Sequence, residues 1–249
     1  EAVAWIAATL AFGRVASFGP VLDRVIGGLG EHPAALLRAS ASDESARDRV
    51  LAAGQARYRW LEAEDLGALL LGLGGVLAAS GSLEAAYATS SSENPWDRLE
   101  WLLAQLRAAV ATAHPRPAER SRSLAFLHPS TRGSAACKRQ HLFLRWMVRP
   151  PREGLDFGIW RALRPDQLVM PADVHTARIG HALGLCSRPD PDRRGADELT
   201  ASLRLIDPQD PVRFDFALCH LGISGACKAR PVEAICGGCG LRALCRWGS

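Results

Sequence analysis

Four cysteines, Cys227, Cys236, Cys239 and Cys245, lie within nineteen residues near the end of the chain, in the stretch CKARPVEAICGGCGLRALC. Thiols at such spacing can form disulfides, bind a zinc ion or hold an iron–sulfur cluster. Disulfides are poorly supported, because the total of seven cysteines is odd and the sequence shows no secretory signal. Zinc sites usually combine two short Cys-x2-4-Cys pairs, whereas this stretch contains a single Cys-x2-Cys.

The spacing Cys-x8-Cys-x2-Cys-x5-Cys favours a four-iron cluster, in which each iron takes one thiolate. We therefore expect a 4Fe-4S cluster on these four cysteines, with zinc as the alternative. The other three thiols, Cys137, Cys186 and Cys219, are expected to lie outside the ligand set.

Lysine is rare in this chain, since only Lys138 and Lys228 occur among 30 basic residues. Arginine does not deprotonate in proteins, whereas a lysine amine can act as a nucleophile. A lysine in such an arginine-rich chain is a candidate for covalent chemistry, and chance retention is the simpler explanation. The net charge of +4 permits a polyanionic partner without requiring one.

Apolar residues recur at helical spacing along most of the chain, and no convincing strand pair or repeat is present, so we expect an all-α fold. Segments 114–134 and 149–172 are polar or rich in proline and are expected to be loops. No run reaches the ~18–20 uncharged apolar residues of a membrane helix, so we expect a cytoplasmic protein. The expected helices are 1–12, 19–29, 64–79, 96–113, 135–148, 173–185 and 211–222, with a further helix start at 80–86.

The segment ALCHLGISGACKARPVEAICGGCGLRALC resembles the C-terminal cluster loop of the endonuclease III branch of the helix-hairpin-helix DNA glycosylases. In that branch a helix ending in glycine leads to a cysteine, a basic stretch with proline, and then Cys-x2-Cys-x5-Cys. The first gap is two residues longer here. The resemblance implies a 4Fe-4S cluster that folds this loop and directs Lys228, Arg230 and Arg242 toward the DNA backbone.

Two further segments resemble the same family. PADVHTARIGHALGL, at 171–185, is similar to its Val-Asp-x-His helix start and places Asp173 on the catalytic aspartate. Aspartate is also a favoured N-cap, so Asp173 can have a structural role alone. GSAACKRQHLFLRWMVR, at 133–149, matches the second helix of the hairpin, with Lys138 where bifunctional members have their nucleophile. It lacks Gly-x-Gly before the lysine, and the long gap of 35 residues to Asp173 is similar to the archaeal 8-oxoguanine glycosylase branch.

The chemistry that this resemblance implies depends on where the second hairpin helix begins. If Ser134 caps that helix and contacts DNA, Lys138 lies about one turn inside, where the helix dipole disfavours an ammonium and backbone amides can hold a phosphate. Lys138 would attack C1′ of the damaged nucleotide, and Asp173 would accept a proton and stabilise the sugar cation. A phosphate contact is the alternative role for Lys138.

AWIAATLAFGRVASFGPVL, at 4–22, resembles the early helix and turn of the family that reaches the DNA opposite the extruded base. This implies a DNA contact for Arg14, which can equally be an ordinary surface arginine. The segment around Arg57, Tyr58 and Arg59 also looks like a bacterial family of uncharacterised helix-hairpin-helix proteins. A pocket for an extruded base needs aromatic side chains that stack on the base and polar side chains that hydrogen-bond to it. Aromatic residues on amphipathic helices are, however, more often part of the core. The candidates are Trp146, Trp160, Phe214 and Asp215.

The resemblance implies a two-lobed helix-hairpin-helix fold in four segments. Residues 1–29 would pack with the C-terminal lobe (151–225), 30–150 would form a central helical domain, and 226–249 the cluster loop. The implied protein is a monomeric, nucleoid-associated bacterial enzyme that excises an oxidised base, such as 8-oxoguanine, from double-stranded DNA and has AP-lyase activity. The alternatives are a monofunctional glycosylase on alkylated or mismatched bases, using Asp173 and water, and a non-catalytic DNA-structure-binding protein.

Overall fold

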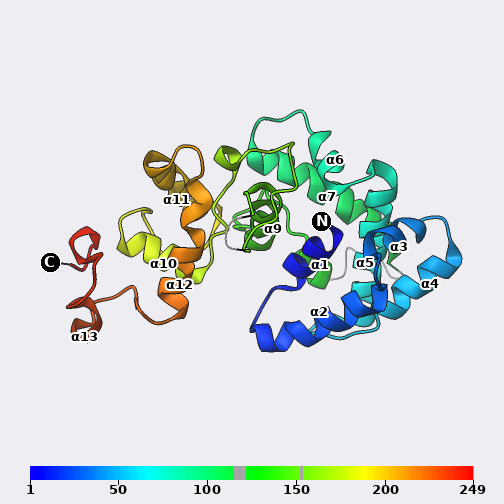
Figure 1. Cartoon of the computed structure of the whole chain (residues 1–249), viewed down its shortest axis with the longest axis horizontal. Coiled ribbons are helices and arrows are strands. Elements are labelled where there is room, and N and C mark those ends of the chain that lie inside the picture. The colour runs from blue at the N-terminus through cyan, green and yellow to red at the C-terminus, as the bar shows by residue number, and fades with distance from the viewer. Residues whose placement is uncertain (115–121, 152–153, 249) are drawn as a thin grey trace. The chain divides into compact units, whose positions relative to one another are not determined.

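The computed structural model describes residues 1–114, 122–151 and 154–248 of the chain. The described residues form helices joined by turns and loops (Figure 1). They contain isolated β-bridges but no β-strand. The prediction of an all-α protein is therefore confirmed.

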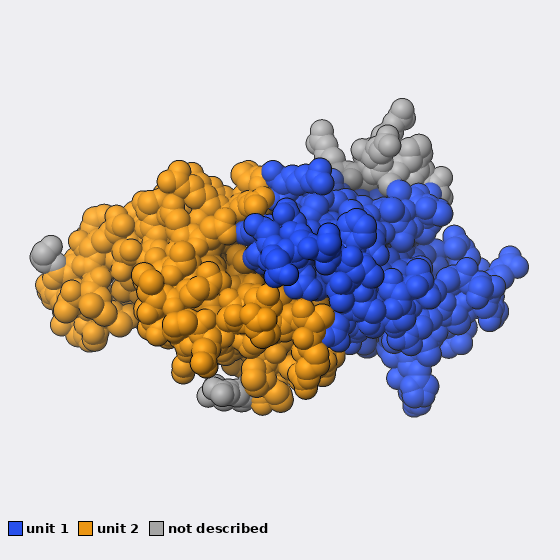
Figure 2. All heavy atoms as spheres, turned by 90° about the horizontal axis from the view of Figure 1, so that it is seen from above, with its two compact units in different colours: residues 1–132 blue, residues 133–249 orange. Residues whose placement is uncertain are grey.

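The chain separates into two compact units, residues 1–132 and 133–249 (Figure 2). This division differs from the four expected segments. Residues 1–29 belong to the first unit, and the helix that begins at Lys138 belongs to the second unit, together with Asp173. The expected packing of residues 1–29 with the C-terminal lobe stays a prediction.

The described part of the first unit contains five helices that lie on predicted helical stretches or on the helix start predicted at 80–86, and three that the pattern did not reveal, α3, α4 and α8. The prediction of a loop over 114–134 was wrong where α8 forms, and its residues 115–121 lie outside the described part of the chain. The helices are α1 (Ala2–Leu10), α2 (Val15–Leu29), α3 (Pro33–Ala39), α4 (Glu44–Ala53), α5 (Ala63–Ser80), α6 (Leu83–Ala88), α7 (Pro95–Ala113) and α8 (Arg122–Leu127).

Helix α4 illustrates why some helices were missed. Its sequence ESARDRVLAA is mostly polar and has no wide apolar stripe. The N-cap Asp43 stabilises its first turn, because its carboxylate accepts hydrogen bonds from the backbone N–H groups of Ser45, at 2.8 Å, and Ala46. The cap is a stronger signal for this helix than its periodicity.

Helix α5 is the central helix of the first unit and packs against α3, α4 and α7. A Cβ atom at Gly72 would lie 2.8 Å from the backbone nitrogen of Val110, so glycine permits the close approach of α7. By length and composition α5 is able to cross a membrane, contrary to the expectation that no segment qualifies. However, 67% of it is buried within the protein, as in the core helix of a globular unit.

The second unit contains helices on the three stretches predicted after residue 133. Helix α11 was not predicted, because the segment SRPDPDRRG was interpreted as a break. Its N-cap Asp192 accepts a hydrogen bond from the backbone N–H of Gly195 at 2.8 Å. The elements are α9 (Lys138–Val148), the 3-10 turn η2 (Pro165–Gln167), α10 (Val174–Ala182), α11 (Arg193–Ile206), η3 (Pro211–Phe214), α12 (Asp215–Ile223), α13 (Glu233–Cys236) and η4 (Arg242–Leu244).

The cysteine-rich segment follows α12 and ends the chain, in red in Figure 1. At its start, the N–H of Cys227 donates to the carbonyl of Leu221 in α12, at 2.9 Å. Near its end, the N–H of Arg246 donates to the carbonyl of Ala182 at the end of α10, at 2.8 Å. Backbone hydrogen bonds therefore hold both ends of this segment to the second unit.

Candidate active site

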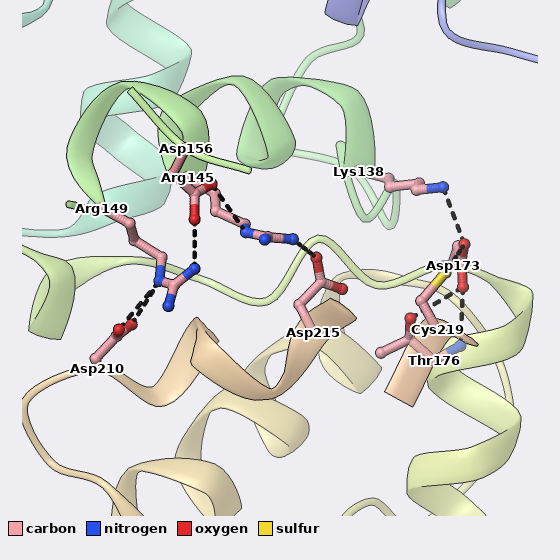
Figure 3. A network of polar contacts seen from close by, with 9 residues as sticks. All are labelled: Lys138, Arg145, Arg149, Asp156, Asp173, Thr176, Asp210, Asp215 and Cys219. Atoms are coloured by element: carbon pink, nitrogen blue, oxygen red, sulfur yellow. Dashed lines mark hydrogen bonds and ion pairs between the residues drawn. The ribbon is translucent and has the colours of Figure 1, made fainter. Parts of the chain in front are cut away.

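Lys138 and Asp173 form an ion pair in the second unit (Figure 3). Lys138 Nζ lies 2.9 Å from Asp173 Oδ2. Lys138 is the first residue of α9, and Asp173 is the N-cap of α10, so the starts of two helices supply the pair. The lysine side chain is 41% exposed, whereas that of the aspartate is 15% exposed. The structure thus brings together the two residues that the sequence assigned to catalysis.

Hydrogen bonds fix the carboxylate of Asp173 at both oxygens. Oδ1 accepts from the N–H of Thr176 at 2.8 Å and from its hydroxyl at 3.0 Å, which confirms Asp173 as an N-cap. Oδ2 accepts from Lys138 and from the thiol of Cys219, whose Sγ lies 3.5 Å away. Burial alone would raise the pKa of Asp173, but the Lys138 charge and the hydrogen bonds from Thr176 and Lys138 outweigh it and hold that pKa below its usual value. At neutral pH the carboxylate is therefore ionised.

The predicted start of the lysine helix was wrong. Helix α9 begins at Lys138 itself, and the residue before it, Cys137, has the left-handed conformation with φ 47° and ψ 38°. Ser134 does not cap the helix; instead its carbonyl accepts a hydrogen bond from the N–H of Arg193 at 2.8 Å. The left-handed turn at Cys137 therefore directs the chain into α9, and Lys138 lies at the first helical position rather than one turn inside.

A buried charge network lies on the same face of α9 as the lysine (Figure 3). Arg145 is seven residues, or two helical turns, after Lys138. Its Nη1 lies 2.6 Å from Asp215 Oδ2 at the start of α12, and its Nε lies 3.3 Å from Asp156 Oδ1. Burial raises the pKa of Asp215 to about 6 in spite of the attraction of Arg145.

Arg149, the C-cap residue of α9, extends this network. Its Nη1 pairs with Asp156, and its Nε lies 3.0 Å from each carboxylate oxygen of Asp210, just before η3. The network joins α9 to the residues that lead into α12, because Asp210 and Asp215 flank η3. These ion pairs thereby fix α12 beside the helix that begins at Lys138.

The four cysteines of the predicted cluster are all half-buried. Backbone N–H groups point at two of their sulfurs: Ala229 donates to Cys227 at 3.3 Å, and Val232 donates to Cys236 at 3.5 Å. Such donors stabilise thiolates and tune iron–sulfur clusters. Within the described residues, no group of three or more metal-binding side chains is gathered. The four thiols suit an iron–sulfur cluster in chemical type and in their spacing along the sequence. The cluster itself stays a prediction.

The residues assigned to DNA contacts lie in both units. Arg14 is the exposed N-cap residue of α2 in the first unit. Lys228 and Arg230 are exposed on the cysteine-rich segment, and Arg242 lies 3.6 Å from Glu233 in an exposed ion pair. These side chains are accessible to a phosphate backbone, and their role stays a prediction.

The four candidates for a base pocket differ in accessibility. Trp160 is only 2% exposed and packs edge-on against Phe143, with ring centroids 5.4 Å apart. Asp215 is buried against Arg145, as described above, whereas Trp146 and Phe214 are half-buried. A base could stack on Trp160 only after local rearrangement. The pocket assignment stays a prediction.

An aromatic cluster in the first unit was missed from the sequence, although the segment Arg57–Arg59, which supplies part of this cluster, was noted. Phe12 contacts Tyr58, Trp60 and Phe126, with ring centroids 4.7, 5.4 and 5.2 Å away. The guanidinium of Arg59 lies 5.7 Å from the ring of Trp60, and its backbone is left-handed, with φ 57°. Trp60 and Phe126 are 45% and 41% exposed. The run Tyr-Arg-Trp was the available signal. We call Phe12, Tyr58, Arg59, Trp60 and Phe126 the aromatic–arginine cluster.

Comparison with known proteins gives a family without a known activity. Residues 1–224 match the family described as "Protein of unknown function (DUF2400)". No curated protein matches the chain, and no solved structure matches it. The family match covers all of the first unit and the second unit through α12. The chain therefore belongs to the DUF2400 family of proteins of unknown function.

Proposed function

We propose that this protein is a DNA glycosylase with AP-lyase activity, which removes an oxidised base from double-stranded DNA. An oxidised purine such as 8-oxoguanine is the favoured substrate. The observation that supports this most directly is the 2.9 Å contact between Lys138 Nζ and Asp173 Oδ2, with the aspartate fixed by Thr176. A partly exposed amine beside a fixed carboxylate is the pair that imine formation at a sugar carbon requires.

The reaction starts when the Lys138 ammonium gives a proton through Asp173 to water, so that the carboxylate is ionised again when the glycosidic bond breaks. The lone pair of the amine then forms a bond to C1′ as the glycosidic bond breaks, and its electron pair leaves with the base, which takes up a proton. The amine then loses a second proton to water, the C1′–O4′ bond breaks as O4′ takes up a proton, and the nitrogen lone pair completes the protonated imine. The imine then permits β-elimination, in which C2′ loses a proton and the C3′–O bond breaks.

The ion pair also supplies electrostatic stabilisation during bond cleavage. In the resting protein, Asp173 faces the positive charge of Lys138. As the glycosidic bond breaks, positive charge develops on the sugar, and the same carboxylate can stabilise it. The hydrogen bonds from Thr176 keep Asp173 in place while the positive charge on the sugar replaces that of the Lys138 ammonium. An arginine in place of Lys138 would preserve the resting pair but would supply no neutral amine.

Two surfaces support DNA as the substrate. The aromatic–arginine cluster offers exposed rings and a guanidinium, which can stack on unpaired bases. Its arginine has a strained left-handed backbone, a feature that is frequent at functional sites.

We further propose that Cys227, Cys236, Cys239 and Cys245 hold a 4Fe-4S cluster, which organises the segment that presents Lys228 and Arg230 to phosphates. The enzyme would act as a monomer in the bacterial cytoplasm.

A panel of duplexes, each with one defined lesion, tests this proposal. The purified protein is incubated with each duplex, and strand breaks are measured with and without subsequent alkali. We expect breaks without alkali for an oxidised purine. Breaks only after alkali would instead support the monofunctional alternative. Binding without excision for every lesion would contradict the proposal and support a DNA-structure-binding protein.

A further inference from the structure

Cys219 contacts the candidate active site from a third helix (Figure 3). It lies on α12, and its Sγ is 3.5 Å from Oδ2 of Asp173, the same oxygen that accepts from Lys138. Helices α9, α10 and α12 thus each supply one member of a three-residue cluster. The sequence resemblance gave Cys219 no role beyond its exclusion from the cysteine ligands.

A close approach of two helices brings the thiol to the carboxylate. Gly222 is three residues after Cys219 and shares its face of α12. A Cβ atom at Gly222 would lie 2.7 Å from Nδ1 of His175 and 2.8 Å from its Cβ, in the first turn of α10. Because glycine has no side chain, α12 approaches the start of α10 closely enough for Cys219 to reach Asp173.

The thiol is the hydrogen-bond donor in this contact. Burial and the nearby carboxylates of Asp173 and Asp215 raise the pKa of Cys219 to about 12. Asp173 is ionised and can only accept, since its own pKa is held below the usual value. At neutral pH the proton therefore lies on sulfur and points at Oδ2.

We propose that Cys219 is a positioning residue, which holds Oδ2 of Asp173 when Lys138 leaves the ion pair to attack the sugar. This inference rests on the proposed function. In the resting protein Oδ2 has two donors, Lys138 and Cys219, whereas Oδ1 is held by Thr176. Once the Lys138 amine forms a bond to C1′, Cys219 is the member of these two that still donates to Oδ2. It keeps the carboxylate directed at the developing sugar cation.

The contact itself can be measured without any substrate. The S–H stretching band of Cys219 is isolated as the infrared difference between wild type and Cys219→Ala. We expect a band shifted to lower frequency, as for a thiol that donates to a carboxylate, and loss of that shift in Asp173→Asn and in Gly222→Ala. In carbon-13 NMR titrations we expect the pKa of Asp173 to rise in Cys219→Ala. A free-thiol band together with an unchanged pKa of Asp173 would overturn the proposal whether or not the protein excises bases.

The positioning role is then tested by kinetics on the lesion that the protein excises. The thiol is a weak donor, so its hydrogen bond should contribute no more than an ordinary one, and Cys219→Ala is expected to lower single-turnover excision about fivefold to tenfold with little change in DNA affinity. Cys219→Ser should recover part of this loss, because its hydroxyl can donate. The matched control is Cys186→Ala, which removes a buried thiol that donates to backbone carbonyls instead. An unchanged rate in Cys219→Ala would overturn the positioning role, whereas inactivity of the wild type would count against the proposed function.

Discussion

Lys138 Nζ lies 2.9 Å from Asp173 Oδ2, although 35 residues separate the two in the chain. The start of α9 provides one partner, and the N-cap of α10 provides the other. Because an N-cap side chain must reach back to its own helix, the direction of the carboxylate is set by folding rather than by substrate. The site is therefore pre-organised on the aspartate side.

Asp173→Asn is expected to abolish excision and to leave the fold intact. Asparagine is a competent N-cap, so the stability loss should be at most about 1 kcal/mol. Without the negative charge, the sugar cation and the proton from Lys138 lose their partner, and single-turnover excision should fall at least about 100-fold. Circular dichroism and duplex binding serve as controls for folding. Near-normal turnover would reduce Asp173 to a structural cap.

Trp60→Ala is expected to weaken binding to DNA that contains an unpaired base about tenfold, because an exposed indole ring supplies stacking energy. Trp101→Ala is the matched control: Trp101 has nearly the same exposure, 47% against 45%, and lies on α7 outside the aromatic–arginine cluster. The measurement is fluorescence anisotropy with abasic and fully paired duplexes. Equal losses in the two variants would contradict a specific role for the cluster.

Cys239→Ser is expected to remove iron from the purified protein, together with its broad absorbance near ~400 nm. Cys186→Ser is the control and should retain iron, because the buried Cys186 thiol donates to the backbone carbonyls of Ala177 and Arg188. Metal analysis and the absorbance spectrum are the measurements. Stoichiometric zinc in the wild type, with no iron, would show that the four thiols serve a zinc site instead.

Acid is expected to destabilise the protein partly through His141. Burial, with a contribution from Arg193, lowers the pKa of His141 to about 3 from its ordinary 6.5. Between these values the unfolded chain binds a proton that the folded chain does not, so the free energy of unfolding must fall as the pH decreases from 6.5 toward 3. His141→Gln removes this titration and should give a shallower decline.

Urea unfolding at a series of pH values measures this slope. The control is His32→Gln, because His32 is exposed in the fold and its ring contacts solvent there. We expect the control to follow the wild type and His141→Gln to differ from both. The same slope in all three proteins would show that His141 does not contribute to acid lability.

Periodicity and breakers predicted the all-α class and the helices α5, α7 and α9, because these have strong apolar faces or long uninterrupted runs. Helix α11 escaped although Ala196, Leu199 and Leu203 recur at helical spacing, because the segment SRPDPDRRG before and at its start was interpreted as a break. Helix α4 escaped because its polar sequence depends on the N-cap Asp43 rather than on periodicity. An aspartate indicates an N-cap only where the residues that follow it already suggest a helix.

The candidate site was predictable in part. The rarity of lysine drew attention to Lys138, and the resemblance of residues 171–185 to the helix start of a glycosylase family drew attention to Asp173. The contact of Cys219 could not be predicted, because it depends on the tertiary approach of α12 to α10 at Gly222. The start of α9 was also wrong in the prediction, since the left-handed turn at Cys137 is unusual for a residue other than glycine.

Borohydride trapping tests the central claim most directly. A Schiff base between Lys138 and C1′ can be reduced to a stable protein–DNA adduct, so the wild type should crosslink to damaged or abasic duplex and not to undamaged duplex. Lys138→Arg should bind DNA but give no crosslink, because guanidinium stays protonated. Lys228→Arg, which removes the other lysine of the chain, is the matched control and should crosslink like the wild type, with the amino terminus blocked in every sample. Full crosslinking by Lys138→Arg would contradict the account and favour an Asp173-centred mechanism that uses water.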